Sequence, residues 1–265
     1  SLAASSPLLS LRINPDLAVK GAGMRMGGGA SPFGIDIEQA PQAIAAARAL
    51  DLEISGFHFY PGSQILRAEL IAELQHHCFA RAVELAAAHD LQLRSLNLGG
   101  GFGIPYFPGD ARLELAPIAA TLSELQAQAQ RDWPQLALHI ELGRYLVGEA
   151  GLYLTRVVDR KVSRGKTFLI TDGGMNHHLA ASGNLGQVLR RNYPLALANR
   201  VDDNARETVT IAGPLCTPLD VLGENVELPV AAPGDLIAVF QSGAYGYSAS
   251  PRDFLSHPWP EEILL

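Results

Sequence analysis

The segment Gln92–Gly103 reads QLRSLNLGGGFG, a short apolar run that ends in a glycine-rich turn. A run of this length followed by turn residues predicts a buried β-strand. Glycines let successive backbone N–H groups converge on an anion such as a phosphate. A dinucleotide-binding Gly-x-Gly-x-x-Gly pattern is excluded, because Ile104 occupies the place of its third glycine. The segment therefore predicts a strand with an anion-binding turn or, alternatively, a tight turn without a ligand.

The same order of strand, turn and helix recurs through the first half of the chain. Apolar runs predict strands at Leu8–Asn14, Glu53–Phe59, Gln92–Leu98 and Ala137–Glu141, and helical periodicity predicts helices at Ile37–Ala49, Gln64–His89 and Leu113–Arg131. This alternation indicates a parallel sheet, which we expect to be apolar on both faces. Since ligands bind at the carboxyl ends of such strands, the four turns are expected to share one site. Four such units make half of an eight-stranded barrel, and we expect the other half upstream of Ser1.

The second half has shorter β-branched runs separated by Gly, Pro and Asn. These runs predict strands at Gly151–Val158, Thr167–Thr171, Thr208–Ile211 and Leu236–Phe240. We therefore divide the chain into residues 1–148, half of a barrel, and residues 149–265, a mainly antiparallel β-rich domain.

Composition narrows the class of protein. The 265 residues include 20 Lys and Arg against 27 Asp and Glu, a net charge of −7 that argues against nucleic acid or an anionic membrane as the main partner. With 48% hydrophobic and 18% charged residues, the chain is predicted to be globular and not disordered. Cys78 and Cys216 lie far apart and match no disulfide framework or zinc-ligand spacing. We expect no metal, and a reducing, cytoplasmic location.

Two charged residues, Glu141 and Arg144, close the fourth predicted strand, where a structural ion pair is one interpretation. The neighbouring motifs favour a different interpretation, a cofactor-binding site. A glycine-rich turn for a phosphate, an acidic residue for a pyridinium nitrogen and a nearby arginine are what a pyridoxal-phosphate site on a barrel requires.

Five motifs, in this order, resemble the fold type III, alanine-racemase-like pyridoxal-phosphate decarboxylases, the diaminopimelate/ornithine decarboxylase family. They are His58–Gln64, Gly99–Gly103, Glu141–Arg144, Gly213–Cys216 and Gly243–Tyr245. Met24–Gly29, Gly174–Asn184 and Phe254–Pro258 are most similar to the exosortase-A-system-associated branch. The resemblance implies an α/β plus β architecture, in which about the second half of a (β/α)8 barrel precedes a C-terminal β-barrel or sandwich domain.

The resemblance also implies roles for individual residues. The implied catalytic residues are Cys216, Glu141 and His58, and the implied cofactor-binding residues are Tyr60, Ser63, Gly99, Gly100, Gly101, Glu141, Arg144 and Tyr245. Glu141 would keep the pyridine nitrogen protonated, so that the ring can accept the electron pair released with carbon dioxide. Cys216 would reach into the partner subunit's site and return a proton, a role that suits a thiol. A small buried cysteine is the alternative.

Several positions depart from the family pattern. Tyr60 replaces a ring-stacking histidine, and Thr217 and Ala180 stand where diamino-acid enzymes carry charged substrate-binding residues. Thr217, Asp220 and His178 are therefore our candidate substrate residues. Because an unpaired desolvated charge costs several kcal/mol, we expect a substrate whose far end is neutral or tethered to a carrier.

The family's Schiff-base lysine has no counterpart at its usual place. Lys20 follows the strand that it should precede, and Lys161 and Lys166 belong to a basic hairpin, so we expect this lysine upstream of Ser1.

The predicted function is pyridoxal-phosphate-dependent decarboxylation of an amino acid by a homodimer with shared active sites. The alternatives are an amino-acid racemase, a diaminopimelate decarboxylase, and a catalytically inactive decarboxylase-like regulator.

Overall fold

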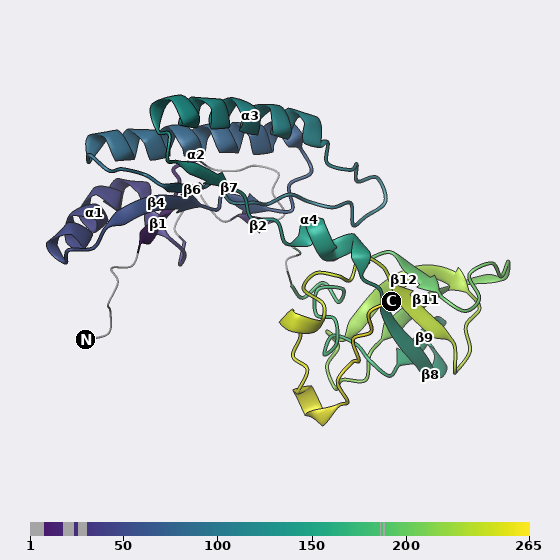
Figure 1. Ribbon diagram of the computed structural model, residues 1–265. Coiled ribbons are helices and arrows are strands. Elements are labelled where there is room, and N and C mark those ends of the chain that lie inside the picture. Colours follow the sequence, from purple (N-terminus) through teal and green to yellow (C-terminus); the bar gives the residue numbers. More distant parts are fainter. Residues whose placement is uncertain (1–7, 18–23, 26–30, 186, 188) are drawn as a thin grey trace. The chain divides into compact units, whose positions relative to one another are not determined.

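The computed structural model describes residues 8–17, 24–25, 31–185, 187 and 189–265 (Figure 1). The chain forms two compact units, one of Ser1–Ile104 and Ala111–Leu142 and the other of Pro105–Asp110 and Gly143–Leu265. Lys20 lies outside the described residues.

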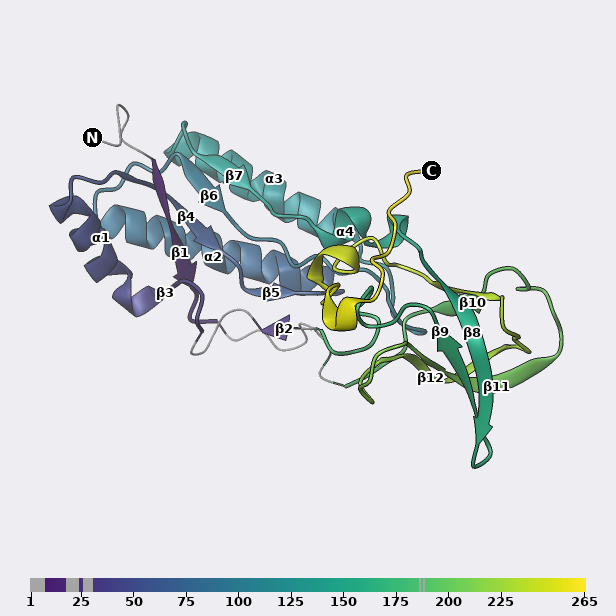
Figure 2. The ribbon, with the colours of Figure 1, turned by 90° about the horizontal axis from the view of Figure 1, so that it is seen from below.

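A parallel sheet of five strands in the order β3-β1-β4-β6-β7 forms the centre of the first unit. The strands are β1 (Leu9–Asn14), β3 (Ile35–Asp36), β4 (Ile54–Phe59), β6 (Ser95–Asn97) and β7 (Ala137–His139), and a short separate pair joins β2 (Met24–Arg25) to β5 (Gly62–Ser63). The helices are η1 (Ile37–Gln39), α1 (Ala40–Ala49), α2 (Ala68–Ala88) and α3 (Leu115–Asp132). Helices α2 and α3 lie along one face of the sheet (Figures 1 and 2).

Side chains alternate across this sheet. Phe57, Phe59 and Leu96 have no exposed surface and belong to the core that the helices complete. The register aligns Arg12, His58, Asn97 and His139 across neighbouring strands, and because adjacent strand residues point to opposite faces, this row faces away from the helices. The expectation of two apolar faces was therefore wrong for the described residues, since the second face presents polar side chains at the strand ends.

The second unit contains α4 (Arg144–Val147) and η2 (Gly148–Ala150) and is built on a six-stranded sheet of order β10-β13-β8-β9-β11-β12. The strands are β8 (Tyr153–Ser163), β9 (Lys166–Thr171), β10 (Leu195–Leu197), β11 (Arg206–Ala212), β12 (Val221–Pro229) and β13 (Leu236–Val239), followed by η3 (Tyr247–Ala249) and η4 (Phe254–Ser256). Every neighbouring pair is antiparallel except β9 and β11. The predicted fold class is confirmed, although β10 and β12 were not foreseen.

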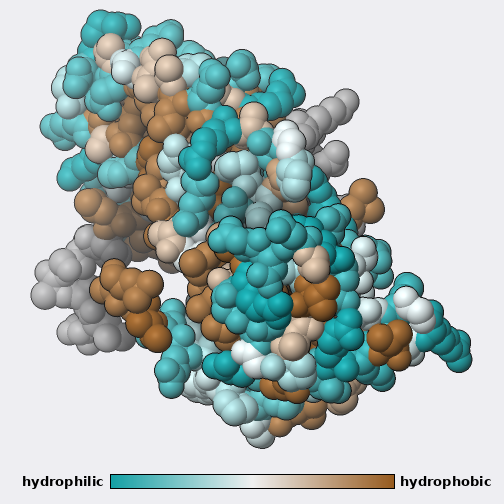
Figure 3. Space-filling view, turned by 90° about the vertical axis from the view of Figure 1, so that its right-hand side faces the viewer, coloured by the Kyte–Doolittle hydropathy of each residue, from teal (hydrophilic) through white to brown (hydrophobic). Residues whose placement is uncertain are grey.

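Exposed apolar residues are scattered over the surface. On the face in Figure 3, hydrophobic residues form separate patches among hydrophilic ones. The large exposed apolar side chains include Leu154, Val158 and Val162 of β8. No helix in the described part of the chain has both the length and the apolar character needed to cross a membrane.

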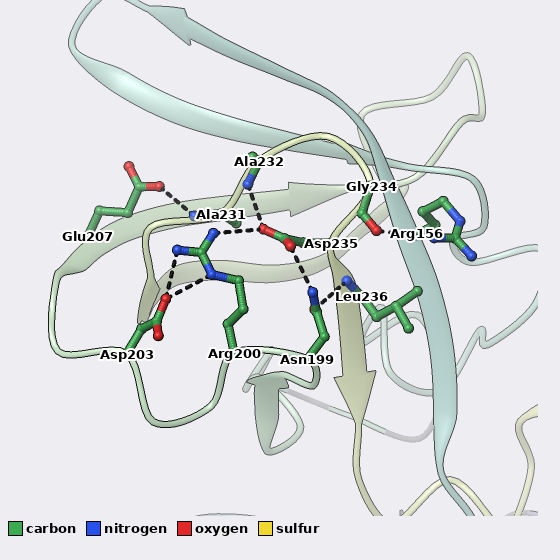
Figure 4. Close-up of polar contacts among 10 residues, drawn as sticks. All are labelled: Arg156, Asn199, Arg200, Asp203, Glu207, Ala231, Ala232, Gly234, Asp235 and Leu236. Atoms are coloured by element: carbon green, nitrogen blue, oxygen red, sulfur yellow. Dashed lines mark hydrogen bonds and ion pairs between the residues drawn. The ribbon is translucent and has the colours of Figure 1, made fainter.

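A polar network around Asp235 fixes the start of β13 (Figure 4). The buried carboxylate accepts hydrogen bonds from Ala232 N–H (2.8 Å) and Asn199 Nδ2 (2.8 Å) and lies 3.4 Å from Arg200 Nη1. Asn199 Oδ1 also accepts a hydrogen bond from Leu236 N–H (2.9 Å). Burial acts to raise the pKa of Asp235, but these hydrogen bonds and the Arg200 charge lower it below its usual value. The network positions the strand that leads to the Gly243–Tyr245 turn.

We expect Asp235→Asn to reduce the free energy of unfolding by about 1–3 kcal/mol at neutral pH, because charge-assisted hydrogen bonds are lost. A pKa that is lower in the folded state stabilises the fold above the ordinary carboxyl value, about 4, and this stabilisation is lost as the pH falls through the folded-state value. The difference in free energy of unfolding between wild type and Asp235→Asn, measured by thermal unfolding at several pH values, should therefore become smaller in acid. Asp202→Asn, at an exposed neighbour, is the control. A difference independent of pH would contradict this assignment.

Candidate active site

The glycine turn after β6 is held against the turn after β7. Gly99 and Gly101 adopt φ of +76° and +84°, the left-handed region that favours glycine. Glu141 N–H donates to Gly99 O (2.8 Å), and a Cβ on Gly100 would overlap the Glu141 carbonyl oxygen. Within the described residues, the N–H groups of Gly100 and Gly101 donate to no partner. The turn therefore offers two backbone N–H donors, without partners among the described residues, of the kind that a phosphate requires.

The Glu141 carboxylate is fixed beside this turn by two side chains. Asn97 Nδ2 donates to Glu141 Oε1 (2.8 Å), and His58 Nε2 lies 3.4 Å from Glu141 Oε2. The Glu141 side chain keeps 46% of its surface exposed, against 21% for His58. The arrangement leaves the carboxylate anchored and still accessible, as an acidic partner of a ring nitrogen must be.

Asn97 is a site residue that sequence reasoning did not identify. Its Oδ1 accepts the N–H of Gly99 (2.9 Å) while its Nδ2 holds Glu141, so one amide joins the carboxylate to the glycine turn. The available sequence signal was its place at the end of the predicted strand, two residues before Gly99.

The motif after β4 closes the far end of the glycine turn. Gln64, at φ +56°, exchanges two hydrogen bonds with the backbone of Ile104, at 2.5 Å from its Nε2 to the carbonyl and 3.3 Å from the N–H to its Oε1. Ser63 precedes it at the end of β5. The Arg12 guanidinium lies 5.7 Å from the ring centre of Tyr60. His58, Tyr60, Ser63, the three glycines and Glu141 thus all belong to the first unit.

The second unit brings Arg144 and Tyr245 together. The Arg144 guanidinium lies 5.1 Å from the ring centre of Tyr245 and 5.5 Å from that of Tyr106, a cation–π arrangement. Tyr245 has φ +58° and follows the Gly243 turn at the end of the β13 region. Lys161 and Lys166 lie in β8 and β9 of the same unit.

The loop that carries Cys216 is held by Asp220. Cys216 is exposed, as a free thiol, between β11 and β12. The Asp220 carboxylate, only 2% exposed, accepts hydrogen bonds from Leu215 N–H (2.8 Å) and Met175 N–H (2.6 Å). It therefore ties the Cys216 loop to the 174–178 loop. Thr217, one residue beyond the thiol, is partly exposed.

His178 is buried in the same framework. Only 1% of its surface is exposed, and its Nδ1 accepts the Ala181 N–H (3.2 Å). Burial lowers the pKa of His178 to about 4, so the imidazole is neutral near pH 7. Ala180 is also buried. Of the three candidate substrate residues, the structure leaves only Thr217 partly accessible.

The chain matches the family described as pyridoxal-dependent decarboxylase, C-terminal sheet domain, over residues 21–243. It is 41% identical to the L-glutamyl-(BtrI acyl-carrier protein) decarboxylase of Niallia circulans over 261 residues, which are 97% of this chain and 61% of that protein. It is 34% identical to the diaminopimelate decarboxylase of Bacillus subtilis over 226 residues, 82% of this chain and 50% of that one.

Solved structures of decarboxylases are also similar to this chain. Diaminopimelate decarboxylase from Helicobacter pylori, complexed with L-lysine, aligns with a TM-score of 0.74 and 29% identity over 91% of this chain and 57% of that chain. Lysine/ornithine decarboxylase from Vibrio vulnificus, complexed with cadaverine, aligns with a TM-score of 0.71 and 27% identity over 86% and 58%. The chain thus spans about half to two thirds of the length of these relatives.

We expect Asn97→Ala in the full-length protein to weaken pyridoxal-phosphate binding about tenfold, because the carboxylate and the glycine turn lose their common hydrogen-bond partner. Titration of the cofactor, followed by its absorbance, measures the dissociation constant, and thermal unfolding checks that the fold is retained. Asn204→Ala, at an exposed position of the second unit, is the matched control. An unchanged affinity of Asn97→Ala for pyridoxal phosphate would show that Asn97 has only a structural role in the sheet.

Proposed function

The chain belongs to the pyridoxal-dependent decarboxylase family, and from this premise we propose that the full-length protein decarboxylates an amino acid with the aid of pyridoxal phosphate. One observation carries the proposal: the Glu141 carboxylate is anchored by Asn97 and His58 next to a glycine turn whose Gly100 and Gly101 N–H groups have no partner among the described residues. A carboxylate for the ring nitrogen and donors for the phosphate are the two contacts that this cofactor asks of its site.

The residues of the first unit fit the cofactor. We assign the phosphate to Ser63 and the Gly99–Gly101 turn, ring stacking to Tyr60, and the pyridine nitrogen to Glu141. The bound cofactor would supply an electron sink for the electron pair left as carbon dioxide departs. Glu141 keeps a proton on the ring nitrogen, and His58, whose Nε2 lies 3.4 Å from Glu141 Oε2, stands beside that carboxylate. Arg144 and Tyr245 are the proposed cofactor residues of the second unit.

Cys216 is the proposed proton donor. Its exposure allows it to act outside its own subunit, and Asp220 holds its loop in a defined shape. We propose a homodimer in which Cys216 serves the partner subunit's site. Both cysteines are free thiols, which supports the proposed cytoplasmic location.

The substrate is proposed to be an amino acid whose far end is joined to a carrier as a thioester, which leaves its α-carboxylate free to depart as carbon dioxide. A free diamino acid needs a charged partner for its far end, but Thr217 and Ala180 supply none and the Asp220 carboxylate is engaged by two backbone N–H groups. A thioester-linked amino acid has no charge at that end. The relative from Niallia circulans, named for an L-glutamyl acyl-carrier protein substrate, supports the same choice.

We expect the full-length protein to release carbon dioxide from an L-glutamyl thioester of an acyl carrier protein, with a kcat/KM about 100-fold or more above that for diaminopimelate, ornithine, lysine or arginine, because their charged ends would stay unpaired. Parallel assays with the five substrates measure this. Efficient turnover of any free diamino acid would contradict the substrate proposal, and Asp220→Asn would then show whether that carboxylate is the partner.

Cys216→Ala should retain the cofactor but lose about 10²- to 10⁴-fold in turnover, the usual effect of removing a positioned proton donor. Cofactor absorbance and carbon dioxide release separate these two effects. Leu219→Ala changes an exposed residue of the same loop and should behave as wild type. Decarboxylation at the wild-type rate by the cysteine variant would rule out this role.

A further inference from the structure

A pocket of about 530 Å³ opens in the second unit, and none of the residues that line it has been assigned a role above. Three segments line it: Phe107–Pro108, residues 190–194, and the Glu224–Asn225 turn of β12. Asn192 ties two of these segments together, since its amide exchanges hydrogen bonds with the Glu224 backbone at 2.8 and 3.0 Å. The pocket is therefore a formed feature with apolar, amide and cationic walls.

Arg190 is a cationic side chain in the wall of this pocket. Its stem lies over Gly183, where a Cβ would come within 2.8 Å of Arg190 Cγ, and its Nη2 donates to the Val221 carbonyl. No carboxylate in the described part of the chain forms an ion pair with it. A guanidinium carries five N–H donors, so most of them stay available on an oriented side chain.

Arg190 is itself exposed, and the other charged residues that line the pocket are Arg191 and Glu224. The Arg191 guanidinium stacks 3.9 Å from the ring centre of Phe107 and lies 3.9 Å from the Asp110 carboxylate, which offsets its charge. Glu224 is exposed on its turn. Arg190 is thus the group that would select an anionic ligand.

The pocket shares a wall with the proposed cofactor residues of the same unit. Tyr193 lines the pocket, and its ring centre lies 4.7 Å from that of Tyr106. Tyr106 in turn packs under the Arg144 guanidinium, which also contacts Tyr245. Two aromatic rings, Tyr193 and Tyr106, would therefore separate a ligand in the pocket from Arg144, which we assign to the cofactor.

We propose that this pocket binds the phosphate of a phosphopantetheine arm, the group through which acyl carrier proteins hold their cargo. The inference rests on the carrier-linked substrate proposed above. A phosphate pairs best with a guanidinium, through charge-assisted hydrogen bonds. Phe107 and Tyr193 give the apolar part of the arm a surface to lie on, and the arm leads from the carrier to the amino acid.

The test compares three L-glutamyl thioesters with the full-length protein: on pantetheine, on phosphopantetheine, and on the intact carrier. We expect the KM for the phosphopantetheine thioester to be about tenfold below that for the pantetheine thioester. Arg190→Gln, which keeps the stem over Gly183, should erase this difference and leave the pantetheine reaction unchanged. Arg190→Lys should restore part of it. Arg164→Gln, at the exposed β8–β9 turn, is the control for loss of one positive charge.

A binding measurement keeps this test independent of turnover. Calorimetric titration with phosphopantetheine and with pantetheine, each without an amino acid, should show tighter binding of the phosphate form in wild type and equal binding in Arg190→Gln. Equal affinity of wild type for the two compounds would overturn the phosphate site. An Arg190→Gln effect confined to the intact carrier would also overturn it, in favour of a contact with the carrier's own surface. If no thioester reacted, the proposed function would fail, and the titration would still decide on the site.

Discussion

The close approach of Gly100 to the backbone of Glu141 is the constraint on which the first unit's part of the site depends. Two neighbouring strands, β6 and β7, end side by side, and their turns share the hydrogen bond from Glu141 N–H to Gly99 O. Any side chain at Gly100 would force the turns apart. The phosphate donors and the carboxylate are therefore spaced by backbone geometry, and Asn97 only completes what the backbone has fixed. A site built on strand ends in this way is more precise than one built on long, flexible side chains.

The second unit uses a buried carboxylate for the opposite purpose. Each oxygen of the Asp220 carboxylate accepts a backbone N–H from a different loop. These hydrogen bonds fix the loop of Cys216 and leave the carboxylate without an oxygen for a substrate. The cost of desolvating a carboxylate is met by these hydrogen bonds, so the group cannot also neutralise a substrate ammonium without giving them up. Substitutions at Thr217 and Ala180 are consequently not compensated by their nearest acidic neighbour.

Sequence patterns were sufficient for elements with a strong local signal. The strands around Ile54–Phe59 and Ala137–His139, the three long helices and the glycine turn were all foreseen, because each combines an apolar run or period with turn residues. Strand β12 was missed because Gly223, Glu224 and Asn225 interrupt its pattern, and the structure forms it by pairing with β11. The polar row of the parallel sheet escaped notice because strand alternation, and not average hydropathy, decides which face a residue occupies.

Roles that depend on contacts distant in sequence could not be read from the motifs. Asn97 reaches Glu141 across 44 positions, and the burial of His178 results from packing against Tyr153 and Tyr193. These contacts also change the electrostatic argument about the substrate. With His178 held neutral, Asp220 engaged and Thr217 uncharged, the candidate substrate residues present no free charge, whereas Arg190 does so elsewhere in the same unit. A substrate whose charge lies in a remote phosphate, and not at the end of its amino-acid side chain, satisfies both observations with one ligand.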